Sequence, residues 1–126
     1  MMRLIVITSP AFLADEAASV NALFEAGLEI LHLRKPHSSI VEVEHLLQSV
    51  SVSFRCRIVL HEHFGLVEKY GMKGIHLNAR NPVAPEEYHG HISRSCHSLQ
   101  EVEEWKNVCD YVFLSPIYDS ISKEGY

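Results

Sequence analysis

Residues 29–61 read EILHLRKPHSSIVEVEHLLQSVSVSFRCRIVLH and contain two short apolar runs with a helical pattern between them. The first run, 29–34, is stopped by a proline, and the second, 57–61, ends in a histidine. Between the two runs Ser39 and Glu42 have the spacing of a capping box, and the apolar residues that follow make one helix face. A strand, a helix and a strand in this order predict a βαβ unit and a parallel sheet.

The alternation of strand and helix patterns extends in both directions from this unit. The expected strands are 4–8, 74–78, 91–95 and 111–114, and the expected helical segments are 13–24, 64–70 and 98–105, with one further helical turn within 81–88. In the last helix Ser98 and Glu101 repeat the capping-box spacing. We therefore expect residues 1–126 to form a single α/β domain with six strands and about five helices.

The composition is that of an ordinary globular protein, because 47% of the 126 residues are apolar and 21% are charged. The net charge is −5 and the 11 Lys and Arg are scattered, which argues against nucleic acid as a partner. No apolar run reaches the roughly 18 residues that a membrane span needs, and we see no signal peptide. The 3 cysteines lack a C-x-x-C spacing, so we expect reduced thiols and a cytoplasmic protein.

Polar side chains stand at the ends of five successive predicted strands. They are His32 with Arg34, His61, His76, Ser95 and Ser115. Because side chains alternate along a strand, these residues can face a common side. The active site lies at the C-terminal strand ends both in a (β/α)₈ barrel and in a doubly wound sheet, so the pattern alone fits either architecture. No G-x-G-x-x-G follows the first strand, so a dinucleotide-binding fold has no local support.

The types of these residues favour an anionic ligand. Arg34 can hold a phosphate through two parallel hydrogen bonds. Ser95 and the loop residues Ser120, Ser122 and Lys123 form a set of hydroxyls and one ammonium that suits phosphate oxygens. The sequence therefore predicts phosphate binding at the strand ends.

Two other kinds of site have weaker support. His61 and His63 have the H-x-H spacing with which a zinc site can begin, but no further residues complete a ligand set with diagnostic spacing. The alternative is that the strand ends at His61 and turns. Cys96 and His97 could suggest a nucleophile and its base, although adjacent side chains usually point apart.

Five segments have the order and spacing of a known family. They are LIVIT (4–8), LHLR (31–34), GIHL (74–77), SCHS (95–98) and SPIYDSISK (115–123). Together they resemble the thiamin phosphate synthases and, equally, their close relatives, the TenI-type thiazole tautomerases. The resemblance covers the whole chain and implies a (β/α)₈ TIM barrel, present here as about six strands and five helices. It also implies that the C-terminal part of the barrel, with two further strands, is missing from these residues.

The synthases join hydroxymethylpyrimidine diphosphate to thiazole phosphate and release diphosphate, in thiamin biosynthesis and with Mg²⁺. The resemblance thus implies a transferase that acts on small phosphorylated substrates and neutralises the departing charge. It implies catalytic roles for Arg34 and Lys123. The residues that it implies in substrate binding are His32, Arg34, Lys35, His61, His76, Ser95, Ser115, Ser120, Ser122 and Lys123. Neither nucleic acid nor a membrane is expected as a partner, and a homo-oligomer stays open.

The implied metal site departs from the family pattern. Glu62 lies where the synthases have an Asn-Asp-Arg after the third strand, and Asn81 falls near the second magnesium aspartate. These two residues are the implied Mg²⁺ ligands, and only Glu62 is a carboxylate.

Two alternative functions remain. His32-x-Arg34 and the run 94–98 are similar to the tautomerase branch, but that branch has a functional histidine at the end of strand six, where this chain has Ser115. A non-catalytic binder of a phosphorylated ligand, which kept the anion site and lost the metal, is the third interpretation.

Overall fold

The computed structural model describes residues 4–115. The chain divides into an N-terminal unit, Met1–Ile75, and a C-terminal unit, His76–Tyr126. The described part contains six strands and five helices, one of them a 3₁₀ helix, and strands and helices alternate along most of it. The predicted parallel α/β class is confirmed, because every strand pair with a determined register is parallel. No helix in residues 4–115 is long and apolar enough to cross a membrane.

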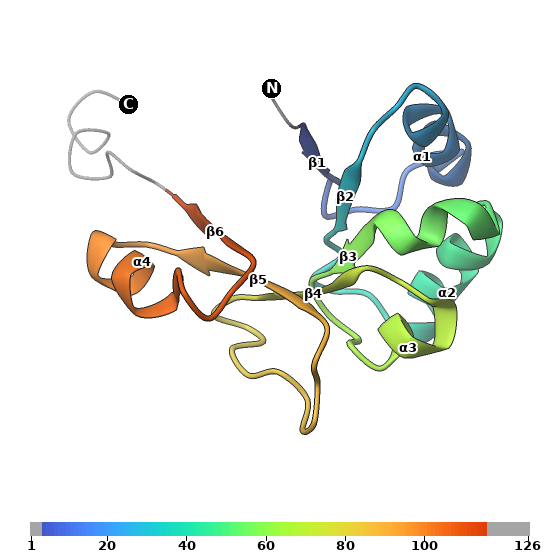
Figure 1. Ribbon diagram of the computed structural model, residues 1–126. Coiled ribbons are helices and arrows are strands. Elements are labelled where there is room, and N and C mark those ends of the chain that lie inside the picture. Colours follow the sequence, from blue (N-terminus) through green and yellow to red (C-terminus); the bar gives the residue numbers. More distant parts are fainter. Residues whose placement is uncertain (1–3, 116–126) are drawn as a thin grey trace. The chain divides into compact units, whose positions relative to one another are not determined.

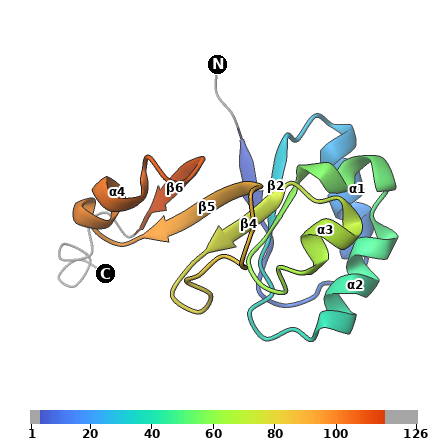
Figure 2. The same ribbon diagram turned by 60° about the horizontal axis from the view of Figure 1, so that its bottom comes forward.

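The N-terminal unit is a run of strand-helix repeats. Its elements are β1 (Ile5–Ile7), α1 (Glu16–Glu25), β2 (Ile30–Leu33), α2 (Ile40–Ser49), the 3₁₀ helix η1 (Val52–Arg57), β3 (Ile58–Leu60), α3 (Leu66–Tyr70) and the start of β4 (Gly74–Leu77). Neighbouring strands are in parallel register, with Val6 opposite Leu31 and Leu60 opposite Ile75. Helices α1, α2 and α3 lie on one side of β2 and β3 (Figure 1, Figure 2).

The core of the N-terminal unit consists of β-branched and leucine side chains from the strands and from one face of each helix. All residues of β2 and β3 are buried, as expected of parallel strands covered on both faces. From the helices, Val20 and Phe24 of α1 and Val43 and Leu47 of α2 are at most 3% exposed. This burial follows the helical spacing in the sequence and fixes which face of each helix packs inward.

The helix ends of this unit follow their sequence signals. The capping box at Ser39 is complete, because its hydroxyl accepts from the Glu42 N–H while the Glu42 carboxylate accepts from the Ser39 N–H. Gly27, just after α1, has φ 108°, and Gly71, just after α3, has φ 63°, so both close a helix in a backbone conformation that glycine adopts easily. Helix α1 begins at Glu16, later than its apolar pattern suggests, because Asp15 at its N-cap is left-handed, with φ 56°.

The C-terminal unit contains β5 (His91–Cys96), α4 (Leu99–Trp105) and β6 (Tyr111–Leu114). Strands β5 and β6 are parallel, and α4 lies beside them in both views (Figure 1, Figure 2). The Ser98 hydroxyl caps α4 by accepting from the Glu101 N–H, as predicted. The second half of the capping box differs, because the Glu101 carboxylate accepts from the His97 N–H, at 3.4 Å.

Two other local predictions differ from the structure. Strand β3 begins at Ile58, because the preceding residues 52–57 form the 3₁₀ helix η1, which the sequence pattern did not predict. Residues 81–88 contain turns and no helix. Neither segment has an apolar helical spacing, and residues 81–88 contain two prolines, so local hydrogen bonds decide their conformation.

Candidate active site at the strand ends

Arg34 directly follows β2. The Thr8 hydroxyl accepts from the Arg34 N–H at 3.0 Å and lies 3.2 Å from the Arg34 carbonyl, to which it can donate, so the backbone at Arg34 is tied to the end of β1. The Arg34 side chain is half-buried. Its guanidinium has no hydrogen-bond or ion-pair partner among residues 4–115. The predicted phosphate-binding group is therefore fixed at its base and has donors to offer at its tip.

Lys35, the next residue, is used differently, because its side chain is fully buried. Its Nζ donates to the carbonyls of Ser9 (2.9 Å) and Ala11 (2.7 Å) and to the Glu16 carboxylate (2.7 Å). The ring of Phe12 lies 4.8 Å from the same nitrogen. An ammonium has three hydrogens to donate, and these partners occupy them all. Lys35 thus anchors the loop between β1 and α1, and direct binding of a substrate would require this arrangement to open.

His32 and His61 form a buried pair at the ends of β2 and β3. Nδ1 of His32 lies 2.8 Å from Nε2 of His61, and the two rings meet edge to face. One nitrogen must donate to the other, so at least one of the two rings is neutral. The predicted inward-facing histidines of these two strands are therefore in direct contact.

The two residues after His61 turn away from each other. The Glu62 carboxylate accepts from the Lys35 N–H at 2.5 Å and is 7% exposed. His63 is left-handed, with φ 53°, and its Nε2 lies 3.0 Å from the Ser38 carbonyl. Because His61 and His63 engage different partners, the H-x-H spacing does not bring two imidazoles to one metal ion.

In the C-terminal unit His76, in β4, lies between two serines of β5. Its Nδ1 is 2.7 Å from the Ser93 hydroxyl, and its Nε2 is 2.7 Å from the Ser95 hydroxyl. His76 and Ser93 are fully buried, whereas Ser95 is half-buried. The imidazole ring also stacks at a tilt on Phe113, with 5.1 Å between ring centroids. The structure thus links His76 and Ser95, both predicted from the sequence, through one hydrogen bond.

The surroundings of His76 disfavour its protonated form. Burial, together with the electrostatic effect of Arg94 and His91, lowers the pKa of His76 to about 4. At neutral pH the ring is therefore neutral and has one N–H to donate and one lone pair to accept with.

His97 directly follows β5, and its ring reaches the residue after β6. Its Nδ1 donates to the Ser115 carbonyl at 2.6 Å. The neighbouring Cys96 is fully buried, and burial raises the pKa of its thiol. A buried thiol with a raised pKa is a poor nucleophile, so the geometry gives no support to a Cys96-His97 catalytic pair.

The remaining predicted residues are Asn81 and the last loop. Asn81 closes a turn after β4, because its N–H donates to the Asn78 side chain and its carbonyl accepts from the Asn78 N–H. Ser120, Ser122 and Lys123 lie outside the described residues.

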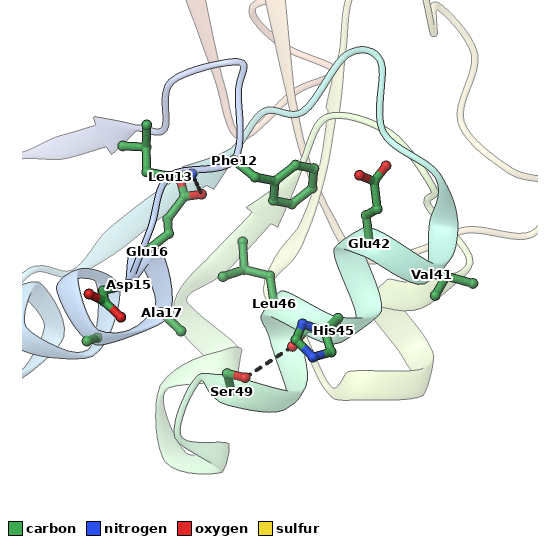
Figure 3. A pocket seen from close by; sticks show the side chains of 11 residues that line it. Phe12, Leu13, Asp15, Glu16, Ala17, Val41, Glu42, His45, Leu46 and Ser49 are labelled. Atoms are coloured by element: carbon green, nitrogen blue, oxygen red, sulfur yellow. Dashed lines mark hydrogen bonds between the residues drawn. The ribbon is translucent and has the colours of Figure 1, made fainter.

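A groove of about 680 Å³ lies elsewhere in the N-terminal unit, between α1 and α2. Figure 3 shows Phe12 and Leu46 pointing into it, with Glu42 and His45 of α2 along one wall. None of the residues that the sequence predicts for the site lines this groove. We therefore place the candidate site at the strand ends and not in this hollow.

Three residues that organise the strand ends were not among the predicted site residues. Thr8 holds the Arg34 backbone, Glu16 neutralises Lys35, and Ser93 binds His76. Each acts across a distance of at least 17 residues in the chain. The only sequence signal for Ser93 is that it shares a strand face with Ser95.

Comparison with known proteins shows the family of the chain. Residues 4–126 match the family model described as thiamine monophosphate synthase. The chain belongs to this family. Its predicted membership is thereby confirmed, and it follows from nearly the whole sequence and not from a single motif.

Named relatives come from bacteria. The chain is 27% identical to a thiamine-phosphate synthase of Caldicellulosiruptor saccharolyticus, over 83% of this chain and 52% of the relative. It is 28% identical to a thiamine-phosphate synthase of Halalkalibacterium halodurans, over 97% of this chain and 63% of the relative. The crystal structure of a thiamine phosphate pyrophosphorylase from Bacteroides thetaiotaomicron is 52% identical, with a TM-score of 0.89, over 94% of this chain and 60% of that one. The chain therefore spans about half to three-fifths of the length of these relatives.

Proposed function

We propose that the full-length protein is a thiamin phosphate synthase that joins hydroxymethylpyrimidine diphosphate to thiazole phosphate and releases diphosphate. In this proposal the present chain supplies the strand ends that bind the diphosphate. Family membership and the 52% identity to a pyrophosphorylase structure support the reaction class. The observation that carries the site assignment is a contrast at the end of β2. The Lys35 ammonium is fully hydrogen-bonded to internal partners, whereas the Arg34 guanidinium has no partner within residues 4–115.

The proposed chemistry assigns the chain an electrostatic task. The bond between the pyrimidine methylene group and the diphosphate breaks, and its electron pair leaves with the diphosphate. The thiazole nitrogen then supplies the electron pair for the new bond to the methylene carbon. Arg34 and Lys123 neutralise the charge that grows on the leaving group, and the hydroxyls of Ser95, Ser120 and Ser122 donate to its oxygens. Catalysis then depends on donors that are already oriented before the bond breaks.

Within each unit, buried polar residues orient the proposed site residues of that unit. His32 and His61 orient each other through their short contact, and His76 positions Ser95. Ser115, at the end of β6, is exposed and contributes a further hydroxyl in this proposal. Lys35 contributes indirectly, because it fixes the loop that follows β1.

The family's Mg²⁺ fits the donor set in part. Mg²⁺ is commonly held by one or two carboxylates together with substrate phosphates, and Glu62 offers one buried carboxylate at a strand end. We therefore propose Glu62 as the protein's carboxylate ligand and the Asn81 amide oxygen as a neutral second ligand. When bound, the ion would neutralise part of the diphosphate charge.

The whole-protein architecture is part of the same proposal. We infer the eight-stranded (β/α)₈ barrel for the full-length protein, located in the cytoplasm, with the six strands seen here as its first part. A crystal structure of the full-length protein would reveal two further parallel strands if this is right, and an open sheet if it is wrong.

The test is an assay of the full-length protein with hydroxymethylpyrimidine diphosphate, thiazole phosphate and Mg²⁺, in which thiamin phosphate is measured. Formation of thiamin phosphate and diphosphate in equal amounts supports the synthase. A folded protein that binds pyrophosphate but forms no product contradicts it and supports a binding-only role.

One observation favours a second candidate, the thiazole tautomerase. That branch has a functional histidine at the end of strand six, and here the His97 ring reaches the Ser115 carbonyl at that position from the β5–α4 loop. Isomerisation of a thiazole carboxylate phosphate by the full-length protein, abolished in His97→Gln, would support the tautomerase. Absence of isomerisation together with thiamin phosphate formation would leave only the synthase.

A further inference from the structure

The hydrogen bonds of His76 allow two arrangements of protons. The neutral ring has one N–H and one lone pair, and it faces Ser93 at Nδ1 and Ser95 at Nε2. If Nδ1 carries the hydrogen, Ser95 must donate its only hydroxyl hydrogen to Nε2 and cannot donate it to a ligand. If Nε2 carries the hydrogen, Ser93 donates to Nδ1 and Ser95 accepts.

Ser93 decides between these tautomers. Its side chain is fully buried, and His76 Nδ1 is the only hydrogen-bond partner of its hydroxyl within residues 4–115. With a hydrogen on Nδ1, the hydroxyl hydrogen of Ser93 would be buried without an acceptor, which is costly. With a hydrogen on Nε2, every polar hydrogen of this pair is satisfied.

In the Nε2–H tautomer of His76, the Ser95 hydroxyl hydrogen at the strand end remains available for donation. The Ser95 oxygen accepts from His76 Nε2–H, so the Ser95 hydroxyl hydrogen is directed elsewhere. Ser95 is half-buried and lies near the C-terminal end of β5, the edge where ligands bind in parallel α/β folds. A hydroxyl held in this way is a donor for an anionic oxygen.

The Nε2–H tautomer exists only in a neutral ring, and the surroundings of His76 keep the ring neutral. Burial and the charges of Arg94 and His91 lower the pKa of His76 to about 4. A protonated ring would donate from both nitrogens, so it would also leave the Ser95 hydrogen unconstrained but would lose the bond from Ser93. Near neutral pH that form is scarce.

We propose that Ser93 is a positioning residue, which acts through His76 to hold the Ser95 hydroxyl as a hydrogen-bond donor to a phosphate oxygen of the ligand. The relay, defined as Ser93, His76 and Ser95, rests on the proposed function only for the identity of that anion. The tautomer of His76 can be measured without any ligand.

The first experiment measures the tautomer directly. Nitrogen-15 NMR of the full-length protein, labelled at histidine, distinguishes Nε2–H from Nδ1–H, and loss of one signal set in His76→Gln assigns the ring. The relay predicts Nε2–H in the wild type and in Ser93→Thr, and a shift toward Nδ1–H in Ser93→Ala. A wild-type ring with the hydrogen on Nδ1 would overturn the proposal, whatever the protein's activity.

The second experiment measures affinity for inorganic pyrophosphate by calorimetry. Ser95→Ala and Ser93→Ala should each weaken binding about tenfold, since each removes one oriented hydrogen bond to a charged oxygen. The double variant should bind no more weakly than Ser95→Ala alone, because Ser93 acts only through Ser95. Ser53→Ala, an exposed serine on η1, is the matched control and should bind like the wild type.

The outcomes separate the relay from a merely structural role. If Ser93 only supported packing, its effect would add to that of Ser95→Ala, and Ser93→Thr would not restore affinity; either result contradicts the proposal. If the wild-type protein binds no pyrophosphate, the proposed function is contradicted, and so is the phosphate oxygen as the acceptor for Ser95. The NMR experiment would still decide whether Ser93 selects the tautomer of His76. Melting curves of all variants ensure that only folded proteins are compared.

Discussion

The two units of this chain differ in how they are buried. In the N-terminal unit β2 and β3 are buried throughout, and α1 and α2 each contribute an apolar face. In the C-terminal unit α4 has no buried residue and β6 is half-buried, yet His76 and Ser93 are fully buried. Among the described residues, the C-terminal unit therefore holds His76 and Ser93 in buried hydrogen bonds although α4 and β6 contribute few buried apolar side chains.

The comparison also reveals a shared arrangement. At the end of β2, buried Lys35 holds the loop while half-buried Arg34 has donors to offer. In β5, buried Ser93 contacts one ring nitrogen of His76, and half-buried Ser95 contacts the other. In both places a fully buried residue with internal hydrogen bonds lies near a half-buried one, and it is the half-buried residue that our proposal assigns to ligand binding.

The largest effect on stability is expected from breaking the buried ion pair of the N-terminal unit. Lys35→Met keeps the length of the side chain but leaves the Glu16 carboxylate buried without its cation. We expect the free energy of unfolding to fall by about 3–5 kcal/mol, measured by urea denaturation.

Lys69→Met is the matched control, because Lys69 pairs with Glu44 at an exposed position. Its unfolding curve should overlap that of the wild type. If both lysine variants lost the same free energy of unfolding, the burial of the Lys35–Glu16 pair would make no difference to stability, and the prediction would be wrong.

A second test compares core packing in the two units. Leu47→Ala in α2 removes a side chain that is 0% exposed and should cost about 2–5 kcal/mol. Leu99→Ala in α4, where the side chain is 74% exposed, should cost less than about 0.5 kcal/mol. Thermal unfolding of both variants would check this, and a larger loss at Leu99 would mean that α4 is covered in the full-length protein.

A third test uses pH to probe the C-terminal unit. The unfolded chain binds a proton at His76 below pH 6.5, whereas the folded protein resists it down to about 4. Stability should therefore fall as pH drops from 6.5 to 4, by on the order of 2–3 kcal/mol from this residue, and the contribution should be constant above pH 6.5. Urea denaturation of His76→Gln should show a shallower pH dependence, and exposed His97→Gln should retain the wild-type slope.

The smallest expected difference concerns the two helix caps. Ser39→Ala removes a complete capping box and should cost about 1 kcal/mol, whereas Ser98→Ala removes a single cap bond and should cost about 0.5 kcal/mol. Differential scanning calorimetry resolves these values. If Ser98→Ala were the more costly change, the second bond of the Ser39 box, in which the Ser39 N–H donates to the Glu42 carboxylate, would have no stabilising role.

Much of the fold could be predicted from the sequence because its signals are local. Apolar runs located five of the six strands, the fifth (β5) was placed despite its polar composition, and the Ser39 box marked the start of α2 to the residue. The Ser98 box was half right, since the Glu101 carboxylate prefers the His97 N–H once β5 ends there. The 3₁₀ helix η1 has no comparable periodic signal.

The site was less accessible to sequence reasoning. Strand alternation correctly brought out His32, His61, His76 and Ser95 as residues at strand ends, but not which of them touch. Lys35 is buried because its Nζ donates to the carbonyls of Ser9 and Ala11, and the positions of these carbonyls follow from the tertiary structure. The same holds for Ser93, because its role depends on the pairing of β5 with neighbouring strands.

The central claim is that Arg34 neutralises the leaving diphosphate. The most direct measurement is the initial rate of thiamin phosphate formation by full-length Arg34→Met at saturating substrates, with the melting temperature measured in parallel. The account predicts that the rate falls by about 100-fold while the melting temperature stays that of the wild type. A rate close to that of the wild type in the folded variant would contradict it.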